Sequence, residues 1–294
     1  MVLKVGILGL GQLGASFAAA LHQAGYDEVW GFARRPETVV EALNAGFITQ
    51  GSTIADADFS QLDLLVLGVP LCPSIQFLKE YRDQLGSLII TDVGSVKGEV
   101  CNKAHEILSG TDVQFIGSHP MTGTEKCGIE ATNPKLFENR VCFITPNDDS
   151  SSDALTAVET VWQAVGMNTV LLTPDSHDEL VAYTSHMVHL VSALVVQTVF
   201  PNNVDRTREL GCAGGFKDVT RVAGGNVNMW MDICKHNRKQ ILASLSQFEE
   251  GLKQLRLSLE EGNEDQLKTF LSDAKDKRNE WHHRYADQPC TKEC

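Results

Sequence analysis

The chain has 294 residues, 43% hydrophobic and 21% charged, so it is long enough for two domains and has the composition of a folded globular protein. Its formal net charge of −13 at pH 7 produces a negative field that repels nucleic acids and anionic membranes. These values exclude a disordered or fibrous protein. We expect a small-molecule substrate rather than a nucleic-acid or membrane partner.

The cysteines and the N-terminus bear on the cellular compartment. Eight cysteines are scattered without a Cys-x-x-Cys pair, which suits reduced thiols in a cytoplasm better than disulfides or a zinc site. The chain opens into a predicted strand over residues 3–8, without a signal-peptide pattern. The longest apolar run, residues 190–200, contains Ser192 and Gln197 and is too short to span a bilayer. We therefore expect a cytoplasmic protein.

Three glycines separate the first predicted strand from a predicted helix over residues 15–24. In the resulting G-x-G-x-x-G motif, the first glycine makes the turn, the second lets a pyrophosphate approach, and the third packs helix on strand. The motif is specific only in this strand–helix context, which the chain supplies. It predicts that a dinucleotide cofactor contacts Gly9, Gly11, Gln12, Leu13 and Gly14.

The end of the second predicted strand, residues 28–32, bears on the choice of cofactor. An NAD site would carry Asp or Glu there to bond the ribose 2′-hydroxyl. This chain has Ala33, Arg34 and Arg35, and two guanidiniums are suited to pair with a 2′-phosphate. We expect NADP, with NAD as the alternative. In a plainer interpretation the arginines only begin a surface helix at Pro36.

Strands and helices then alternate, which is typical of a parallel sheet. This predicts a Rossmann-type, doubly wound α/β domain over residues 1–173, followed by an all-α dimerisation domain over residues 174–294. Val69 and Pro70 follow a predicted strand and should lie at the ligand edge of the sheet. The predicted strands cover residues 64–68, 88–91, 113–116, 140–144 and 168–172, the last two extending the sheet, and the predicted helices cover residues 74–81, from about 96, and 155–164.

A histidine next to a proline follows the strand predicted at residues 113–116. His119 precedes Pro120, which favours extended or turn geometry, and it is expected just past a strand end, where open parallel sheets place ligands. Ser95 follows another predicted strand and is expected to begin a helix. Its hydroxyl would then cap free N–H groups, so position alone leaves structural and chemical roles equally open.

The second half is predicted to be helical, beginning with one helix from Thr173 to a stop at Pro201. It is apolar nearly all round beyond Met187, as expected for a helix at the centre of a domain or dimer. His186 and His189 lie three residues apart, with an aspartate two turns earlier on the same side. Two histidines can begin a metal site, but no third ligand has suitable spacing, so we expect no metal.

Further along, two closely spaced cations lie between glycine pairs. Lys217 and Arg221 are four residues apart in a predicted short helix, and an arginine fork is suited to a bidentate carboxylate contact. Long amphipathic helices are predicted over residues 227–261 and 264–285. Because so apolar a central helix needs a partner to bury it, we expect a homodimer.

Taken together, four stretches resemble the prephenate/arogenate dehydrogenase family of tyrosine biosynthesis, over nearly the whole chain. They are Asp-Val-Gly-Ser-Val-Lys at 92–97, Ser-His-Pro-Met-Thr-Gly-Thr-Glu at 118–125, Ser-His-Met-Val-His at 185–189 and Phe-Lys-Asp-Val-Thr-Arg at 216–221. The resemblance implies a catalytic role for His119, oriented by Ser95 beside the nicotinamide, and substrate contacts from Arg221 to the ring carboxylate, from His189, and from Glu125 at the site entrance. We add His186 and Lys217 as candidate substrate contacts.

One departure from the family pattern concerns His189. The family often has His-Leu-Pro where this chain has His-Met-Val at residues 186–188. We expect the missing proline to straighten the helix locally and to shift His189.

The resemblance implies an oxidative decarboxylation. A hydride passes from the hydroxyl-bearing ring carbon to the nicotinamide, the hydroxyl loses its proton, and carbon dioxide leaves as the ring aromatises. The residues do not separate prephenate from arogenate, although a histidine at position 189 suits an anionic pyruvyl group and favours prephenate slightly. The alternatives are a β-hydroxyacid dehydrogenase-like oxidoreductase, whose Lys-x-x-Asn is absent after Thr173, and a non-catalytic NADP-binding sensor.

Overall fold

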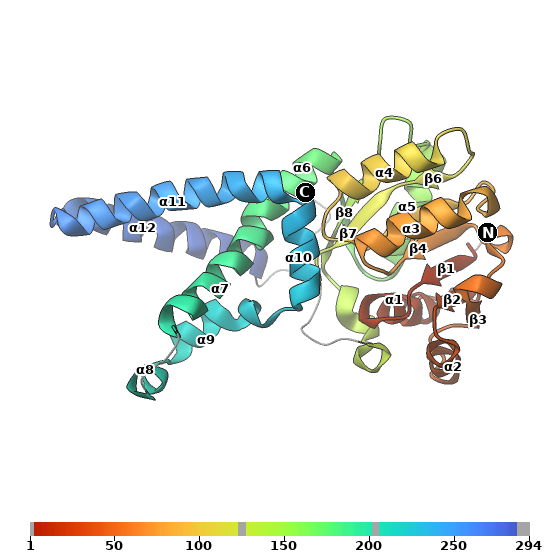
Figure 1. Cartoon of the computed structure of the whole chain (residues 1–294), viewed down its shortest axis with the longest axis horizontal. Helices are drawn as coiled ribbons and strands as arrows, with labels where there is room; N and C mark the ends of the chain where they lie inside the picture. Colours follow the sequence, from red (N-terminus) through yellow and green to blue (C-terminus); the bar gives the residue numbers. More distant parts are fainter. Residues whose placement is uncertain (1–2, 123–127, 202–205, 287–294) are drawn as a thin grey trace. The chain divides into compact units, whose positions relative to one another are not determined.

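The computed structural model describes residues 3–122, 128–201 and 206–286 (Figure 1). Its contacts divide the chain into two compact units, Met1–Asp178 and the residues from Glu179 onward. The division falls inside a helix that begins at Pro174, close to the proposed domain boundary between residues 173 and 174.

The first unit is built on a parallel sheet of six strands in the order β3-β2-β1-β4-β5-β6. The central strands are apolar and fully buried, as expected when helices cover both faces. The strand Gln50–Thr53 was not predicted, because its sequence, Gln-Gly-Ser-Thr, has no apolar residue. The strands are β1 (Val5–Leu8), β2 (Val29–Ala33), β3 (Gln50–Thr53), β4 (Leu64–Leu67), β5 (Ile89–Asp92) and β6 (Gln114–Phe115).

Helices cover the two faces of this sheet and create two cores. Figure 1 shows α3 and α4 on one side of the sheet and α1 and α2 on the other. Strand residues alternate between the two buried clusters, so that Ile7 faces one core and Leu8 the other. The doubly wound α/β prediction is confirmed. The helices are α1 (Gln12–Gln23), α2 (Pro36–Asn44), α3 (Leu71–Tyr81) and α4 (Gly98–Leu108), with short 3-10 turns at Ile54–Asp56, Phe59–Gln61 and Arg82–Gln84.

A second sheet departs from the prediction. β7 (Gly117–Pro120), β8 (Val141–Thr145) and β9 (Asn168–Leu171) form a separate three-stranded sheet instead of extending the first. β7 runs antiparallel to β8, with His119 opposite Phe143, and β8 runs parallel to β9. Helix α5 (Ser152–Ala164) joins β8 to β9, and 3-10 turns cover Ile129–Ala131 and Pro134–Phe137.

The change of sheet happens at Gly117. A Cβ atom there would lie 2.4 Å from Thr145 Oγ1 and 2.7 Å from Cys101 Sγ, so only glycine lets the chain cross so close. His119 therefore lies within a strand and not in a loop beyond one, which corrects the prediction.

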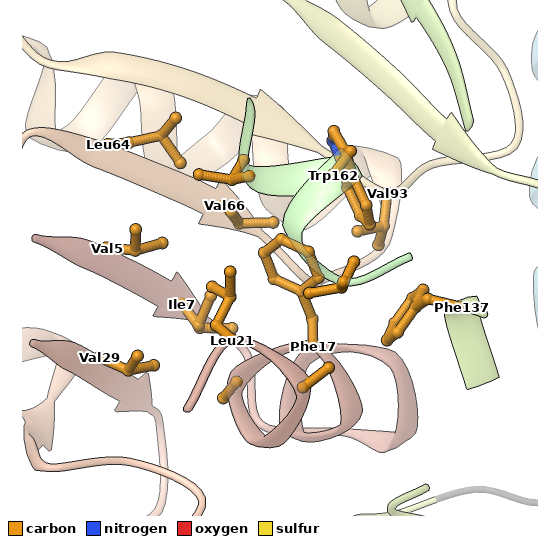
Figure 2. Packing of buried hydrophobic residues seen from close by; sticks show 14 of the residues in the cluster. Val5, Ile7, Phe17, Leu21, Val29, Leu64, Val66, Val93, Phe137 and Trp162 are labelled. Carbon is orange, nitrogen blue, oxygen red and sulfur yellow. The ribbon is translucent and has the colours of Figure 1, made fainter. Parts of the chain in front are cut away.

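An aromatic cluster packs under this second sheet (Figure 2). Phe17 on α1 contacts Trp162 on α5, with ring centroids 4.3 Å apart, and Phe137 at 5.7 Å. Trp162 also donates a hydrogen bond from Nε1 to Ser118 Oγ at 3.0 Å. A hydrogen bond thus connects the main apolar core to Ser118, the residue next to His119.

The second unit is helical in its described part, as predicted. The predicted helix over residues 227–261 is interrupted at Asn237, whose buried side chain bonds His186. The elements are α6 (Pro174–Val181), a π-helical turn (Ala182–His186), α7 (Met187–Val199), α8 (Arg206–Leu210), α9 (Gly214–Thr220), a 3-10 turn (Arg221–Gly224), α10 (Val227–His236), α11 (Arg238–Glu260), α12 (Glu264–Trp281) and a π turn (His282–Ala286).

The stretch Pro174–Val199 is unusually apolar and poorly covered. Among the described residues it is the one helix long and apolar enough to cross a membrane by length and composition, with a mean hydropathy of 1.4 over 18 residues. The core helix of a globular protein passes the same test, but only 22% of this window is buried within the chain. The apolar surface of α7, including Val188 and Leu194, is left for a partner to cover.

Candidate active site

The glycine motif forms a tight turn between β1 and α1. Gly9 has φ +98°, and a Cβ there would lie 2.4 Å from Val69 Cγ1. A Cβ on Gly14 would lie 1.9 Å from the Gly9 carbonyl oxygen, so α1 packs directly on the turn. Gly11 has no atom within 4 Å of its added Cβ, and no side chain caps α1 at this residue. This geometry fits an anionic group approaching the start of α1.

The two arginines lie where a 2′-phosphate is expected. β2 ends at Ala33, and Arg34 and Arg35 follow it with exposed side chains. α2 does begin at Pro36, as the plainer interpretation held, with Arg35 as its N-cap residue. Within the described ranges neither guanidinium forms an ion pair, so both are available to a phosphate.

A double substitution tests this assignment. Arg34→Ala with Arg35→Ala is expected to raise KM for NADP by about 10- to 100-fold, because each charge-assisted hydrogen bond contributes about 1.5–3 kcal/mol. KM for NAD should change less than threefold. Initial rates at varied cofactor give both constants, and Lys103→Ala, another exposed cation of the same unit, is the control. Equal effects on the two cofactors would contradict the assignment.

His119 is held by His177, which is held in turn by Asp178, and no local sequence pattern marks either residue as its partner. Its side chain is 8% exposed, and its Nδ1 lies 2.8 Å from Nε2 of the fully buried His177. Nδ1 of His177 lies 2.8 Å from Asp178 Oδ1. Burial is the main cause that lowers the pKa of His177, against the hydrogen bond to Asp178, which raises it. His177 is therefore a neutral ring between His119 and a carboxylate.

Asp178 also caps α4, which corrects the prediction for Ser95. That helix begins at Gly98, and the N–H groups of Lys97 and Gly98 donate to the Asp178 carboxylate at 2.7 and 2.8 Å. The cap is supplied from 81 residues away, so no local signal marks it. Ser95 is half-buried in the loop before α4, and among the described residues no hydrogen bond joins it to His119. The role of Ser95 stays a prediction.

A buried ion pair ties this loop to the strand of His119. Lys97 is completely buried, and its Nζ pairs with Asp92 Oδ2 and donates to the Ser118 carbonyl at 2.8 Å. Asp92 in turn accepts from the N–H of Gly94 at 2.9 Å and of Ser118 at 3.0 Å. The pair therefore fixes the β5–α4 loop and the residue next to His119 relative to each other.

In the second unit His189 stacks on a tryptophan that was not predicted. The ring centroids of His189 and Trp230 are 4.0 Å apart. Nδ1 of His189 lies 2.9 Å from the Ser185 carbonyl oxygen, so Nδ1 carries the proton. Burial first, and Arg221 to a smaller extent, lower the pKa of His189. We conclude that its Nε2 presents a lone pair, which accepts hydrogen bonds.

The other predicted substrate contacts of this unit differ in exposure. His186 is buried, and the Asn237 amide nitrogen lies 3.1 Å from its Nδ1, as in a structural residue, so its substrate role stays a prediction. Lys217 on α9 and Arg221 at the next turn are exposed. A hydrogen bond of 2.9 Å from Ser192 Oγ on α7 to the Val219 carbonyl fastens this segment. Glu125 lies outside the described residues.

The helix leading to His189 is not regular, contrary to the expected straightening. The N–H of Met187 bonds the carbonyl of Ala182, five residues earlier, and residues 182–186 form a π turn. With valine instead of proline at position 188, the chain keeps an N–H there. The π turn contains one residue more than an α-helical turn, and this extra residue determines the direction in which the His189 side chain points. Such π turns often occur at functional sites.

Comparison with known proteins identifies the family. The profile described as "Prephenate dehydrogenase, nucleotide-binding domain" matches residues 17–171, and "Prephenate dehydrogenase, dimerization domain" matches residues 173–273. The chain belongs to the prephenate dehydrogenase family. It is accordingly an NAD(P)-dependent oxidoreductase with a Rossmann-type domain and a helical dimerisation domain.

Individual members of the prephenate dehydrogenase family agree with this assignment. Prephenate dehydrogenase of Bacillus subtilis is 30% identical over 93% of this chain and 74% of its own length. The crystal structure of Aquifex aeolicus prephenate dehydrogenase with hydroxyphenyl propionate and NAD+ has a TM-score of 0.88, 30% identity, and coverage of 95% of this chain and 98% of that one. Synechocystis arogenate dehydrogenase has a TM-score of 0.82 and 28% identity, over 95% of this chain and 100% of that one. The β-hydroxyacid dehydrogenase and sensor alternatives are not favoured.

Proposed function

We propose that this enzyme oxidatively decarboxylates prephenate or arogenate, giving 4-hydroxyphenylpyruvate or tyrosine in tyrosine biosynthesis. The observation that carries the proposal is His119, a nearly buried ring on β7 held through Nδ1 by His177. A neutral imidazole is the side chain best suited to take a proton near pH 7. Both family profiles and the named relatives support the same reaction class.

In this mechanism His119 accepts the proton of the ring hydroxyl while the hydride passes to the nicotinamide. The nicotinamide cofactor supplies the hydride acceptor, and the turn at Gly9, Gly11 and Gly14, with Gln12 and Leu13, would hold its pyrophosphate. Val69 and Pro70 follow β4 and would line the same edge. Aromatisation supplies the driving force, so the chain has mainly to position the substrate and take up the proton.

We propose that Arg221 binds the ring carboxylate, with Lys217 four residues before it as a further substrate contact, and that Ser95 orients His119 beside the nicotinamide. Arg221→Ala is expected to raise KM for the substrate by roughly 10- to 100-fold, because a hydrogen bond to a charged group contributes about 1.5–3 kcal/mol. KM for the cofactor should change less than twofold. Arg238→Ala, an arginine of the same unit at the start of α11, is the matched control in initial-rate measurements. An unchanged substrate KM would remove Arg221 from this role.

The protonation of His189 bears on the substrate side chain. If His189 contacts it, the lone pair on Nε2 suits the amino group of arogenate, a hydrogen-bond donor. An anionic pyruvyl group would require the protonated ring. The tautomer of His189 therefore shifts the balance away from prephenate, which we favoured slightly from the sequence.

We also propose NADP as the preferred cofactor, a homodimer formed through the helical domain, and a cytoplasmic location. The exposed arginines after β2 support the first proposal. The poorly covered apolar window of α7 supports the second, since a second copy would bury it. The scattered cysteines, of which Cys101, Cys142, Cys212 and Cys234 are free thiols in the described part of the chain, suit the third.

The test is the formation of reduced cofactor at 340 nm with purified protein. Prephenate and arogenate are given separately, each with NADP and with NAD. Turnover of either substrate supports the proposed reaction and ranks substrates and cofactors in one experiment. No turnover in all four mixtures, with NADP binding intact by calorimetry, would overturn it in favour of the sensor.

A further inference from the structure

We propose that His177 and Asp178 are positioning residues that fix the tautomer of His119 and share the positive charge it acquires. His119 would carry its proton on Nδ1 and its lone pair on Nε2, the nitrogen that takes the hydroxyl proton. The proposal rests on the proposed function, in which His119 is the base.

The hydrogen bonds determine the tautomers one after another, beginning at the carboxylate. Asp178 accepts from the N–H groups of Lys97 and Gly98, so it is an acceptor, and the ring nitrogen 2.8 Å from Oδ1 must donate. Nδ1 of His177 therefore carries a proton.

The assignment then passes from His177 to His119. A neutral His177 with its proton on Nδ1 has a lone pair on Nε2, and His119 Nδ1, 2.8 Å away, must donate to it. The lone pair of His119 is then on Nε2. The complete burial of His177 supports the neutral ring.

The proton balance of the reaction can be followed through this chain. The hydroxyl O–H bond breaks as its proton moves to His119 Nε2, and the hydride leaves the ring carbon for the oxidised nicotinamide. The Nδ1 proton of His119 is shared toward His177 Nε2, so the positive charge spreads over two rings facing the Asp178 carboxylate. Carbon dioxide departs, and the electron pair of the broken carbon–carbon bond completes the aromatic ring. As the ring aromatises, the former carbonyl oxygen becomes a phenolate oxygen, and His119 returns its proton to that oxygen, so that the product leaves as the phenol.

Asp178 is the carboxylate that bonds His177 directly. Lys97 and Asp92, the other charges that act on His177, form a buried ion pair and largely cancel. From β8 the Phe143 ring packs on His177 with a centroid distance of 5.7 Å. The nearby thiols, Cys101 and Cys142, stay protonated, because burial raises the pKa of Cys101 to about 11 and that of Cys142 well above its usual value.

Asp178→Asn is the decisive substitution. Because the Lys97 N–H and His177 Nδ1 share Asp178 Oδ1, the amide oxygen should stay at that position and keep both tautomers, while the negative charge that faces the rings is lost. We expect kcat to fall about 10- to 100-fold, because the charge-assisted hydrogen bond between His177 and the carboxylate is lost. KM for substrate and cofactor should stay within threefold. Because a negative charge is lost, the acid limb of the pH–kcat profile should move to lower pH by at least half a unit.

His177→Gln separates orientation from charge sharing. The glutamine carbonyl can accept from His119 Nδ1 and keep the tautomer, but it cannot take up a proton, so we expect a smaller loss of about tenfold. Glu179→Gln removes an exposed carboxylate from the adjacent position and should leave kcat and the pH profile unchanged.

Nitrogen-15 NMR of histidine-labelled protein reads the tautomer without substrate, with His119→Asn assigning the signal. We expect a pyridine-type Nε2 in the wild type and also in Asp178→Asn. A pyrrole-type Nε2 in the wild type would overturn the tautomer assignment. An unshifted acid limb in Asp178→Asn, while kcat falls only with the folded fraction, would reduce Asp178 to a helix cap and overturn the charge sharing. If the wild type turns over neither substrate, the proposed function fails while the tautomer assignment is still tested.

Discussion

His119→Asn should lower kcat by about 10²–10⁴-fold, the usual contribution of a general base. The asparagine amide can replace Nδ1 as a donor to His177, so the strand and the core beneath it should stay intact. What the variant lacks is a group that can take up the hydroxyl proton. Cofactor binding should be unchanged, because the glycine turn and the arginines after β2 are untouched.

The measurement is a set of initial rates with saturating cofactor, together with calorimetric titration of NADP. His105→Asn, which replaces a histidine whose side chain is 60% exposed on α4, is the matched control and should keep full activity. Turnover within fivefold of the wild type in His119→Asn would show that another group takes up the proton, and the proposed mechanism would have to be abandoned.

The largest expected loss of stability comes from Lys97→Met. Its side chain is 0% exposed and that of Asp92 is 4% exposed, so the substitution leaves a buried carboxylate without its counter-ion. Removing one partner of such a pair typically costs about 3–5 kcal/mol in free energy of unfolding. The loop carrying Ser95 and the backbone at Ser118 would also lose a common anchor. Urea denaturation followed by circular dichroism measures the change.

The same helix provides a matched control for this substitution. Lys103 and Glu106 form an exposed pair at 2.7 Å, with side chains 42% and 68% exposed. Lys103→Met is expected to leave the midpoint of urea denaturation nearly unchanged, because water solvates both charges. Similar losses in the two variants would mean that the burial of Lys97 is not what makes its ion pair important.

Local signals were sufficient for the cofactor turn and for most helices. The spacing of Gly9, Gly11 and Gly14 between a strand and a helix requires only neighbouring residues, and the structure reproduces it. Pro174 and Pro201 likewise bound the predicted helix correctly, because proline acts on its own backbone and on the residue before it.

The features that the sequence could not predict depend on distant contacts. β7 reads as the continuation of a parallel strand, and only its antiparallel pairing with β8 separates the two sheets. From the sequence, His177 and Asp178 are expected in the exposed, polar first turn of the helix that begins at Pro174. Its complete burial follows from packing against β7 and β8, which no local pattern encodes. For the same reason the sequence predicts Ser95 as the cap of α4, whereas Asp178 supplies that cap.

The number of residues in the π turn at Ala182–His186 determines the direction in which the side chains of α7 point about the helix axis. An α-helix advances about 100° per residue, and a π turn holds one residue more than the α-helical turn it replaces. Deletion of one residue between Val181 and Met187 would leave a continuous helix, and the amino-acid sequence of α7 would be unchanged. Every side chain from Met187 onward, including His189 and Ser192, would nevertheless be rotated by about 100° about the axis. In this segment a single-residue deletion would therefore be more damaging than most substitutions.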